Sequence, residues 1–226
     1  MQLFSLNHFF WLGITIAFVV GCHTMRLIHP NSVLHQIFRF SLFILVCFNE
    51  LAWFLYRHYV EEITISQNLP LHLCDISVLI MLYTLFSKRS WMGELSYFMG
   101  AVGALLAVCM PAIDEVGTIR LIAEIRYFIT HIALVGVGIY FTFGQRSFPL
   151  YSSIWRSYGF VNLYALLITP LNVLLGTNYF FTISAPQQLT FLFVFPHWLF
   201  LIGASLVFLI IFHLLYVPFI LFNRKF

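Results

Sequence analysis

Residues 193–222 read FVFPHWLFLIGASLVFLIIFHLLYVPFILF and contain no aspartate, glutamate, lysine or arginine. About 20 apolar residues in a helix cross the roughly 30 Å hydrocarbon core of a bilayer. The stretch therefore predicts a transmembrane helix. Uncharged runs of similar length recur along the chain and lack the alternation of outer-membrane strands. The sequence thus predicts an all-α polytopic membrane protein.

The composition of the whole chain points the same way. Hydrophobic residues make up 62% of the 226 residues and charged residues 8%. An average soluble domain has roughly 45–50% apolar and about 25% charged residues. The mean hydropathy is +0.95. These values exclude an ordinary soluble domain, a disordered chain and a nucleic-acid-binding protein.

The apolar runs predict seven transmembrane helices in a single domain, residues 1–226. Pro30, Pro70 and Pro149 lie near the predicted ends, where proline interrupts a helix. In the fourth helix, small residues recur at close spacing and predict tight helix packing. The predicted helices are residues 7–25, 34–57, 69–86, 91–109, 121–143, 155–175 and 193–222.

Lysine and arginine residues are unevenly divided between the two sides of the predicted membrane domain. One side carries eight: Arg26, Arg39, Lys88, Arg89, Arg146, Arg156, Arg224 and Lys225. The other carries three: Arg57, Arg120 and Arg126. Positive charge is concentrated on the cytoplasmic side of membrane proteins. The bias predicts an amino terminus outside and a carboxy terminus in the cytoplasm.

Polar residues within the predicted helices identify a candidate site, because ionisable groups in hydrocarbon are costly and usually face the bundle interior. They gather at one depth, in the outer leaflet. The set is Glu50, His72, Cys74, Asp75, Arg126, His131, Asn172 and His197. The inner half looks emptier, with Glu50 and Asp75 taken as the only acids inside the membrane. The alternative is a hydrogen-bond network that only holds the helices together.

Cys74 is the candidate nucleophile in this layer, and it needs a base or a cation nearby. In a regular helix His72 and Asp75 share a face, whereas Cys74 lies about 200° from His72. The alternative is that His72, which follows Pro70 closely, lies before the helix proper. The base is therefore expected from another helix, with His131 first by depth and His197 second. Arg126, Asn172 and the amides after Pro70 are candidate donors for an oxyanion.

Metal binding is a rival use of the same layer. His72, Asp75, His131, Glu50 and His197 carry possible nitrogen and oxygen ligands. No HExxH-like spacing supports a metal site. The four cysteines also lack CxxC or zinc spacing. The expectation is that the protein needs neither a metal nor another cofactor.

The segment Leu69–Cys74, LPLHLC, resembles the signature of the YwaF-like bacterial integral membrane proteins. Further similar segments follow in order: RYFITH at 126–131, GTNYFF at 176–181 and FPHW at 195–198. The resemblance covers roughly residues 35–220. It implies a multi-pass protein of a bacterial plasma membrane.

The YwaF-like proteins are similar to a vertebrate transmembrane phospholipid acyltransferase with a cysteine active centre, and more distantly to membrane hydrolases of fatty-acid esters. The resemblance implies Cys74 as nucleophile and His131 as base. The expected function is acyl transfer or ester hydrolysis on a membrane lipid. A transporter or binding protein for a small solute or cation is the alternative. A partnership with a second copy or another membrane protein stays open.

Overall fold

In the computed structural model, residues 4–60, 64–111, 113, 120–185 and 196–222 are described, and these are helical without strands. Six of the described helices are long and apolar enough to cross a membrane, and a seventh, at residues 73–87, is apolar but shorter. The predicted all-α membrane architecture is therefore confirmed for the described residues. The orientation of the termini stays a prediction.

The observed helix bounds lie within a few residues of the predicted ones. Two of the long helices each include a π-helical turn, so that α5, η2 and α6 form one span and α7 continues into η3. The elements are α1 (Leu6–Thr24), η1 (Met25–Leu27), α2 (Val33–Tyr59), α3 (Ile65–Asn68), α4 (Leu73–Ser87), α5 (Ser90–Leu95), η2 (Ser96–Gly100), α6 (Ala101–Cys109), α7 (Arg120–Ile139), η3 (Tyr140–Gly144), α8 (Tyr151–Leu175), η4 (Tyr179–Phe181) and α9 (His197–Phe222).

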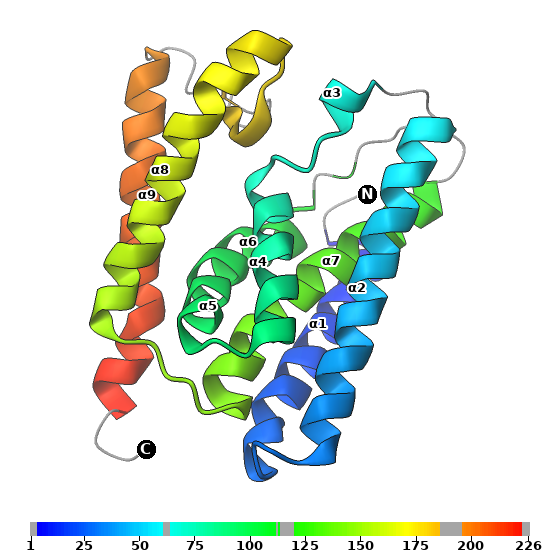
Figure 1. Cartoon of the computed structure of the whole chain (residues 1–226), viewed down its shortest axis with the longest axis vertical. Coiled ribbons are helices and arrows are strands. Elements are labelled where there is room, and N and C mark those ends of the chain that lie inside the picture. The colour runs from blue at the N-terminus through cyan, green and yellow to red at the C-terminus, as the bar shows by residue number, and fades with distance from the viewer. Residues whose placement is uncertain (1–3, 61–63, 112, 114–119, 186–195, 223–226) are drawn as a thin grey trace.

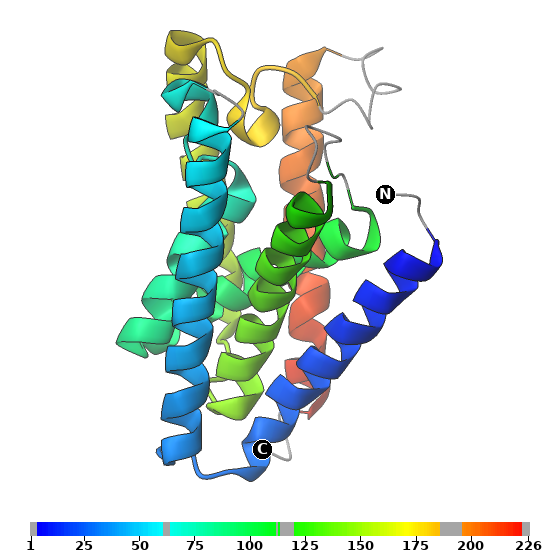
Figure 2. The same cartoon turned by 90° about the vertical axis from the view of Figure 1, so that its right-hand side faces the viewer.

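The helices form a bundle with α7 at its centre. Figure 1 shows α8 and α9 as an antiparallel pair on one side and α1 and α2 on the other, with α4 to α7 between them. Figure 2 shows α1 inclined to the other helices. α7 contacts α1, α2, α4 and α6. A central helix with neighbours on several sides can carry polar groups away from lipid.

The small residues of the fourth predicted helix pack against α7 as expected. A Cβ added at Gly100 would lie 3.1 Å from the carbonyl oxygen of Leu134. Only a residue without a side chain allows the two backbones to approach so closely. The central core beside this contact includes Met81, Val137 and Tyr140, each 0% exposed. This packing fixes α4 and α7 next to each other.

Three predicted helices begin four residues away from their observed starts. The seventh was expected from residue 193, and α9 is described from His197. The third was expected from residue 69, but α4 begins at Leu73, with the extended His72 as its N-cap; Pro70 disfavours a helical conformation at Leu69. The sixth was expected from residue 155, but α8 begins at Tyr151. There the Ser153 hydroxyl accepts a hydrogen bond from the Leu150 amide at 3.0 Å. Hydropathy misses such a polar first turn.

The prediction that Glu50 and Asp75 are the only acids inside the membrane is wrong. Glu94 in α5 is 7% exposed and Glu124 in α7 is 5% exposed. Glu124 accepts hydrogen bonds from Asn7 and from Trp11 Nε1, and thereby ties α1 to α7. Glu94 bonds to α8. The neutral donors of Glu124, and the serine and arginine beside Glu94, offset the cost of placing these carboxylates within apolar helices.

Candidate functional site

A cavity of about 610 Å³ lies between α2, α4 and α7. Its lining holds six of the eight predicted site residues: Glu50, His72, Cys74, Asp75, Arg126 and His131. The other two, Asn172 and His197, do not line it. The predicted polar residues that line the cavity therefore come from α2, α7 and the start of α4 rather than from five or six helices.

The first turn of α4 places Cys74 at the amino end of a helix. His72 is the N-cap, with extended backbone angles of φ −69° and ψ 159°. Its backbone N–H donates to Asp75 Oδ2 at 3.0 Å. His72 thus precedes the helix, so the geometry of a regular helix does not relate it to Asp75 or to Cys74. Cys74 becomes the second helical residue.

This position matters for the chemistry of the thiol. The first amides of a helix have no partner within it, and the helix dipole favours negative charge at that end. A thiolate of Cys74 and an oxyanion beside it would both gain from the amino end of α4.

An ion pair between α2 and α7 forms the charged wall of the cavity. Arg126 Nη2 lies 2.5 Å from Glu50 Oε2 and 4.0 Å from Asp75 Oδ1. The Thr130 hydroxyl donates to Glu50 Oε1, and Asn49 Nδ2 donates to the Thr130 hydroxyl at 3.0 Å. These hydrogen bonds and the opposite charge offset part of the desolvation cost of burying the ions between apolar helices. The network links α2, α4 and α7.

Arg126 is further held by an aromatic contact. Its guanidinium carbon lies 5.5 Å from the centre of the Trp53 ring, within the range of a cation–π interaction. Its Nε is buried and has no hydrogen-bond partner among the described residues. Trp53 also lines the cavity. The arginine is thus fixed in place and keeps one donor unused.

His131 is oriented for proton transfer by its own helix. Its Nδ1 lies 2.7 Å from the carbonyl oxygen of Tyr127, one turn earlier in α7. A carbonyl can only accept, so Nδ1 carries the proton and Nε2 has the free lone pair. The residue is 5% exposed, and its ring packs 4.1 Å from the Tyr127 ring. A histidine held in this tautomer suits a general base.

The thiol of Cys74 has space on the side of α6. A Cβ added at Gly103 would lie 4.0 Å from Cys74 Sγ. Within the described chain, no hydrogen bond joins the thiol directly to His131, although both line the cavity. Catalytic hydrogen bonds are often longer in an empty site. The two groups therefore share a cavity without being locked together.

Asn172 and His197 hold a loop instead of contacting the cavity. Asn172, 1% exposed, donates from Nδ2 to the Tyr179 carbonyl at 2.7 Å and to the Thr182 hydroxyl at 2.9 Å. Its Oδ1 accepts from the Tyr179 amide at 2.8 Å. His197 Nε2 donates to the Thr182 carbonyl at 3.0 Å. Asn172 is thus no oxyanion donor, because the loop occupies its amide.

The loop brings Tyr179 to α3 and to Leu69, which follows it. The Tyr179 hydroxyl donates to the Ser66 carbonyl at 2.6 Å and accepts from the Leu69 amide at 3.1 Å. Burial raises the pKa of this hydroxyl, which therefore remains protonated. Exposed backbone polar groups are tolerated at membrane depth only where something else satisfies them. Tyr179 satisfies the Ser66 carbonyl and the Leu69 amide in this way at the edge of the cavity.

Sequence reasoning missed several residues that line the cavity. Charge and depth identified the ionisable groups, but aromatic residues gave no comparable signal in a chain that is 19% aromatic. Arg57 was counted only for orientation. The missed lining residues include Trp53, Arg57, Tyr127, Tyr179 and Phe181. No group of three or more potential metal-ligating residues occurs in the described segments.

Comparison with known families gives one result. A family model described as the TMEM164 family matches residues 3–216, nearly the whole chain. No curated protein and no solved structure matches the chain.

Proposed function

The chain belongs to the TMEM164 family, a family of transmembrane proteins, and we propose that it is a multi-pass membrane enzyme acting on lipid acyl groups. Cys74 is the nucleophile and His131 the general base. The observation that carries the proposal is the single cavity that receives a thiol from the amino end of α4 and an imidazole from α7. The resemblance of residues 69–74 to YwaF-like proteins supports the same pair.

The proposed reaction has two displacement steps. His131 Nε2 takes the thiol proton, and Cys74 Sγ attacks the ester carbonyl. A sulfur–carbon bond forms, the ester carbon–oxygen bond breaks, and the lysolipid leaves with the proton from the imidazolium. An acceptor hydroxyl or water then gives its proton to His131 and attacks the thioester. The acyl group leaves the sulfur, and the thiol is restored.

The oxyanion of each tetrahedral intermediate needs hydrogen-bond donors. The backbone amides of Leu73 and Cys74 are suitable, because first-turn amides lack partners within the helix. The His72 amide is not available, since it donates to Asp75. Arg126 and Glu50 balance each other, so the cavity keeps a polar wall without a large net charge. We assign these residues to headgroup binding and positioning.

The apolar wall of the cavity suits an acyl chain. Leu51 of α2 and Leu79 of α4 line it and are 58% and 52% exposed. Phe54 and Leu82 line the same side. In a membrane, exposed apolar side chains contact lipid. A lipid can therefore reach the cavity sideways between α2 and α4, with its ester near Cys74.

The test is trapping of the acyl-enzyme on the purified full chain in phospholipid vesicles. A thioester adds the mass of one acyl chain and is cleaved by neutral hydroxylamine. We expect this adduct in the wild type and not in Cys74→Ala, with turnover lower by at least about 10³-fold. Cys47→Ala, a change of a thiol on α2 outside the cavity lining, is the matched control.

Two outcomes contradict the proposal. Unchanged lipid turnover in Cys74→Ala removes the nucleophile. Solute uptake into vesicles that is lost in Cys74→Ala, without any acyl adduct in the wild type, supports the transport alternative.

We also propose that the cavity opens to the outer leaflet of a bacterial plasma membrane, from the uneven division of lysine and arginine. Labelling of the carboxy terminus in intact cells by an impermeant reagent would contradict that orientation.

A further inference from the structure

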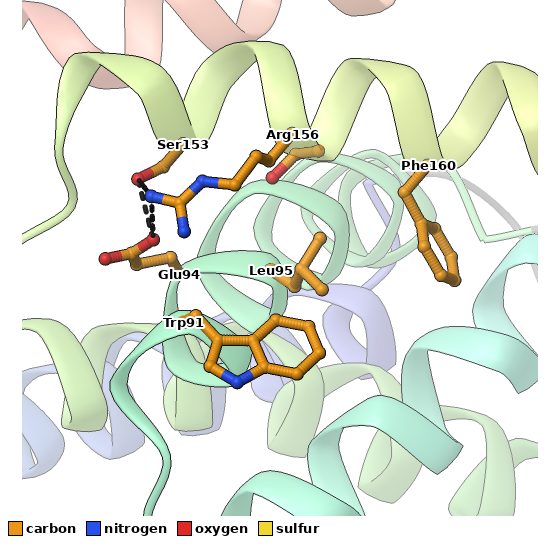
Figure 3. A pocket seen from close by; sticks show the side chains of 7 residues that line it. Trp91, Glu94, Leu95, Ser153, Arg156 and Phe160 are labelled. Atoms are coloured by element: carbon orange, nitrogen blue, oxygen red, sulfur yellow. Dashed lines mark hydrogen bonds and ion pairs between the residues drawn. The ribbon is translucent and has the colours of Figure 1, made fainter.

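A second, smaller cavity lies between α5 and α8, beyond the carboxy-terminal end of α4. Its volume is about 210 Å³, several times the roughly 30 Å³ that one water occupies. Figure 3 shows Glu94, Ser153 and Arg156 on one side of it and Trp91 and Phe160 on others. None of the residues assigned to acyl transfer lines this cavity.

The polar side of this cavity is a fixed cluster. The Ser153 hydroxyl accepts from the Leu150 amide and donates to Glu94 Oε2 at 2.7 Å. Arg156 Nη2 lies 3.0 Å from the same Glu94 oxygen. The carboxylate is thus satisfied, and it holds the guanidinium at the edge of the cavity (Figure 3).

The cluster leaves donors unused. Arg156 makes all its described polar contacts through Nη2, so Nε and Nη1 are left over, and its side chain is 48% exposed. Ser157 is 1% exposed, lines the cavity, and its hydroxyl has no hydrogen-bond partner in the described chain. A buried hydroxyl without a partner is costly. Together these donors form a site for an acceptor with several oxygens.

The other walls are apolar and continue along the helices. Leu95 follows Trp91 by one turn in α5, and Phe160 follows Arg156 by one turn in α8. Trp91 is 44% exposed, as expected of tryptophan at a membrane interface. A ligand for this cavity therefore has a polar group with acceptors beside an apolar part.

The surrounding charge favours an anion. Lys88 and Arg89 lie directly before α5, and both are exposed. Glu94 is the one acid that lines the cavity, and it is already paired with Arg156. Basic side chains near a membrane surface attract anionic lipids.

We propose that this cavity binds the phosphate headgroup of an anionic phospholipid, with Arg156 and Ser157 as donors and Trp91, Leu95 and Phe160 against the start of its acyl chain. The lipid is a bound partner of the fold, not a substrate. The proposal goes beyond the proposed acyl transfer and does not depend on it, because it needs neither Cys74 nor His131.

The test uses Trp91 as the reporter. The full chain is placed in bilayers of phosphatidylcholine with increasing fractions of phosphatidylglycerol, and one lipid at a time has brominated chains that quench tryptophan. The Trp91 signal is the difference between the wild type and Trp91→Phe. We expect half-maximal quenching at a roughly tenfold lower fraction of phosphatidylglycerol than of phosphatidylcholine, because phosphatidylcholine carries a choline cation that offsets the charge of its phosphate, whereas phosphatidylglycerol is a net anion.

Two variants and one control assign the preference to this cavity. Arg156→Gln should abolish it. Ser157→Ala breaks no hydrogen bond of the protein, so it should fold normally and lower the preference about twofold. Arg89→Gln removes a neighbouring charge that does not line the cavity and should keep most of the preference.

Three results would overturn the proposal. They are equal quenching by the two lipids, an unchanged preference in both Arg156→Gln and Ser157→Ala, and loss of the preference on adding inorganic phosphate in excess. The last would identify a site for free anions rather than lipid. If Arg156→Gln does not fold, Ser157→Ala decides alone.

Discussion

The two cavities each contain a carboxylate–guanidinium pair between helices, yet they differ in what surrounds the pair. Arg126 and Glu50 have side chains 19% and 23% exposed and lie near a thiol and an imidazole. Arg156 and Glu94 have side chains 48% and 9% exposed, with only serine hydroxyls as other polar neighbours. An intramembrane ion pair alone therefore indicates a polar cavity and not a reaction.

The comparison also shows which residues could carry chemistry. The first cavity has a nucleophile at a helix amino terminus and a base with a fixed tautomer. The second has donors without a nucleophile stronger than serine. Changes in the first cavity should therefore alter turnover, whereas changes in the second should alter lipid preference and leave turnover unchanged.

The largest expected effect is the loss of His131. His131→Gln keeps a donor near the Tyr127 carbonyl but removes the basic nitrogen. We expect lipid turnover to fall about 10²–10⁴-fold, the usual contribution of a general base. Alkylation of Cys74 by iodoacetamide should slow in the same variant. Both rates are measured on the purified protein in vesicles.

His213 provides a matched control for His131. Its Nδ1 also donates to the carbonyl four residues earlier, Leu209, at 2.8 Å, but it lies on α9 outside the first cavity. His213→Gln should leave turnover and alkylation within about twofold of the wild type. Equal losses in the two variants would show that both histidines act through packing, and that the base is wrongly assigned.

The two arginines should differ in their contribution to stability. Arg126→Met leaves Glu50 without its cation, and breaking a mostly buried pair costs about 3 kcal/mol. Arg156→Met removes a partner that is half exposed, which is worth about 1 kcal/mol or less. The measurement is the midpoint of thermal unfolding in a fixed detergent. Similar losses in both variants would remove the distinction between the two pairs.

Much of the fold could be predicted from the sequence, because apolar runs of membrane length are a strong signal. The failures have physical reasons. Hydropathy could not see the polar first turn of α8 that Ser153 caps, nor that α4 begins only at Leu73, after the extended His72. It also overlooked Glu94, whose partners lie on α8, far along the chain. Hydrogen bonds between residues far apart in the chain produce no periodic pattern in the sequence.

The site could be predicted only in part. Depth and charge gathered the right ionisable residues, and six of them share a cavity. Depth failed for Asn172 and His197, because a residue at the right level can point into a loop instead. The expectation of an emptier inner half was also wrong. It overlooked pairs such as Thr84 with Ser96 and Tyr158 with Ser205.

Asn172 tests whether the loop matters to the first cavity. Asn172→Ala removes four hydrogen bonds to a buried loop, and we expect a loss of about 1–3 kcal/mol in unfolding free energy. The apparent Michaelis constant should rise, because Tyr179 and Phe181 line the cavity. Asn162→Ala on the same helix is the control. An unchanged Michaelis constant in Asn172→Ala would make the loop irrelevant to substrate binding.

Leu79 tests the sideways route between α2 and α4. Leu79→Trp adds bulk to a lining residue, so it should slow turnover of long-chain esters several-fold and spare short water-soluble esters. Phe86→Trp, on the same helix and 77% exposed but outside the lining, is the control. Equal slowing of long and short esters by Leu79→Trp would contradict a separate route for the acyl chain.

The smallest effect is expected for Gly103→Ala, because the change adds a single methyl group beside the first cavity. The added Cβ in Gly103→Ala would lie 4.0 Å from Cys74 Sγ, an ordinary contact. Turnover should therefore stay within about twofold, while alanine in place of glycine within a helix adds about 0.5–1 kcal/mol of stability. Gly203→Ala on α9, where nothing lies within 4 Å of the added atom, gives the helix effect alone. Gly103→Leu, by contrast, would extend toward the sulfur and should block alkylation of Cys74 without disturbing Trp91 in the second cavity. If Gly103→Leu alkylates as fast as the wild type, the thiol does not open on this side, and the attack would have to come from elsewhere.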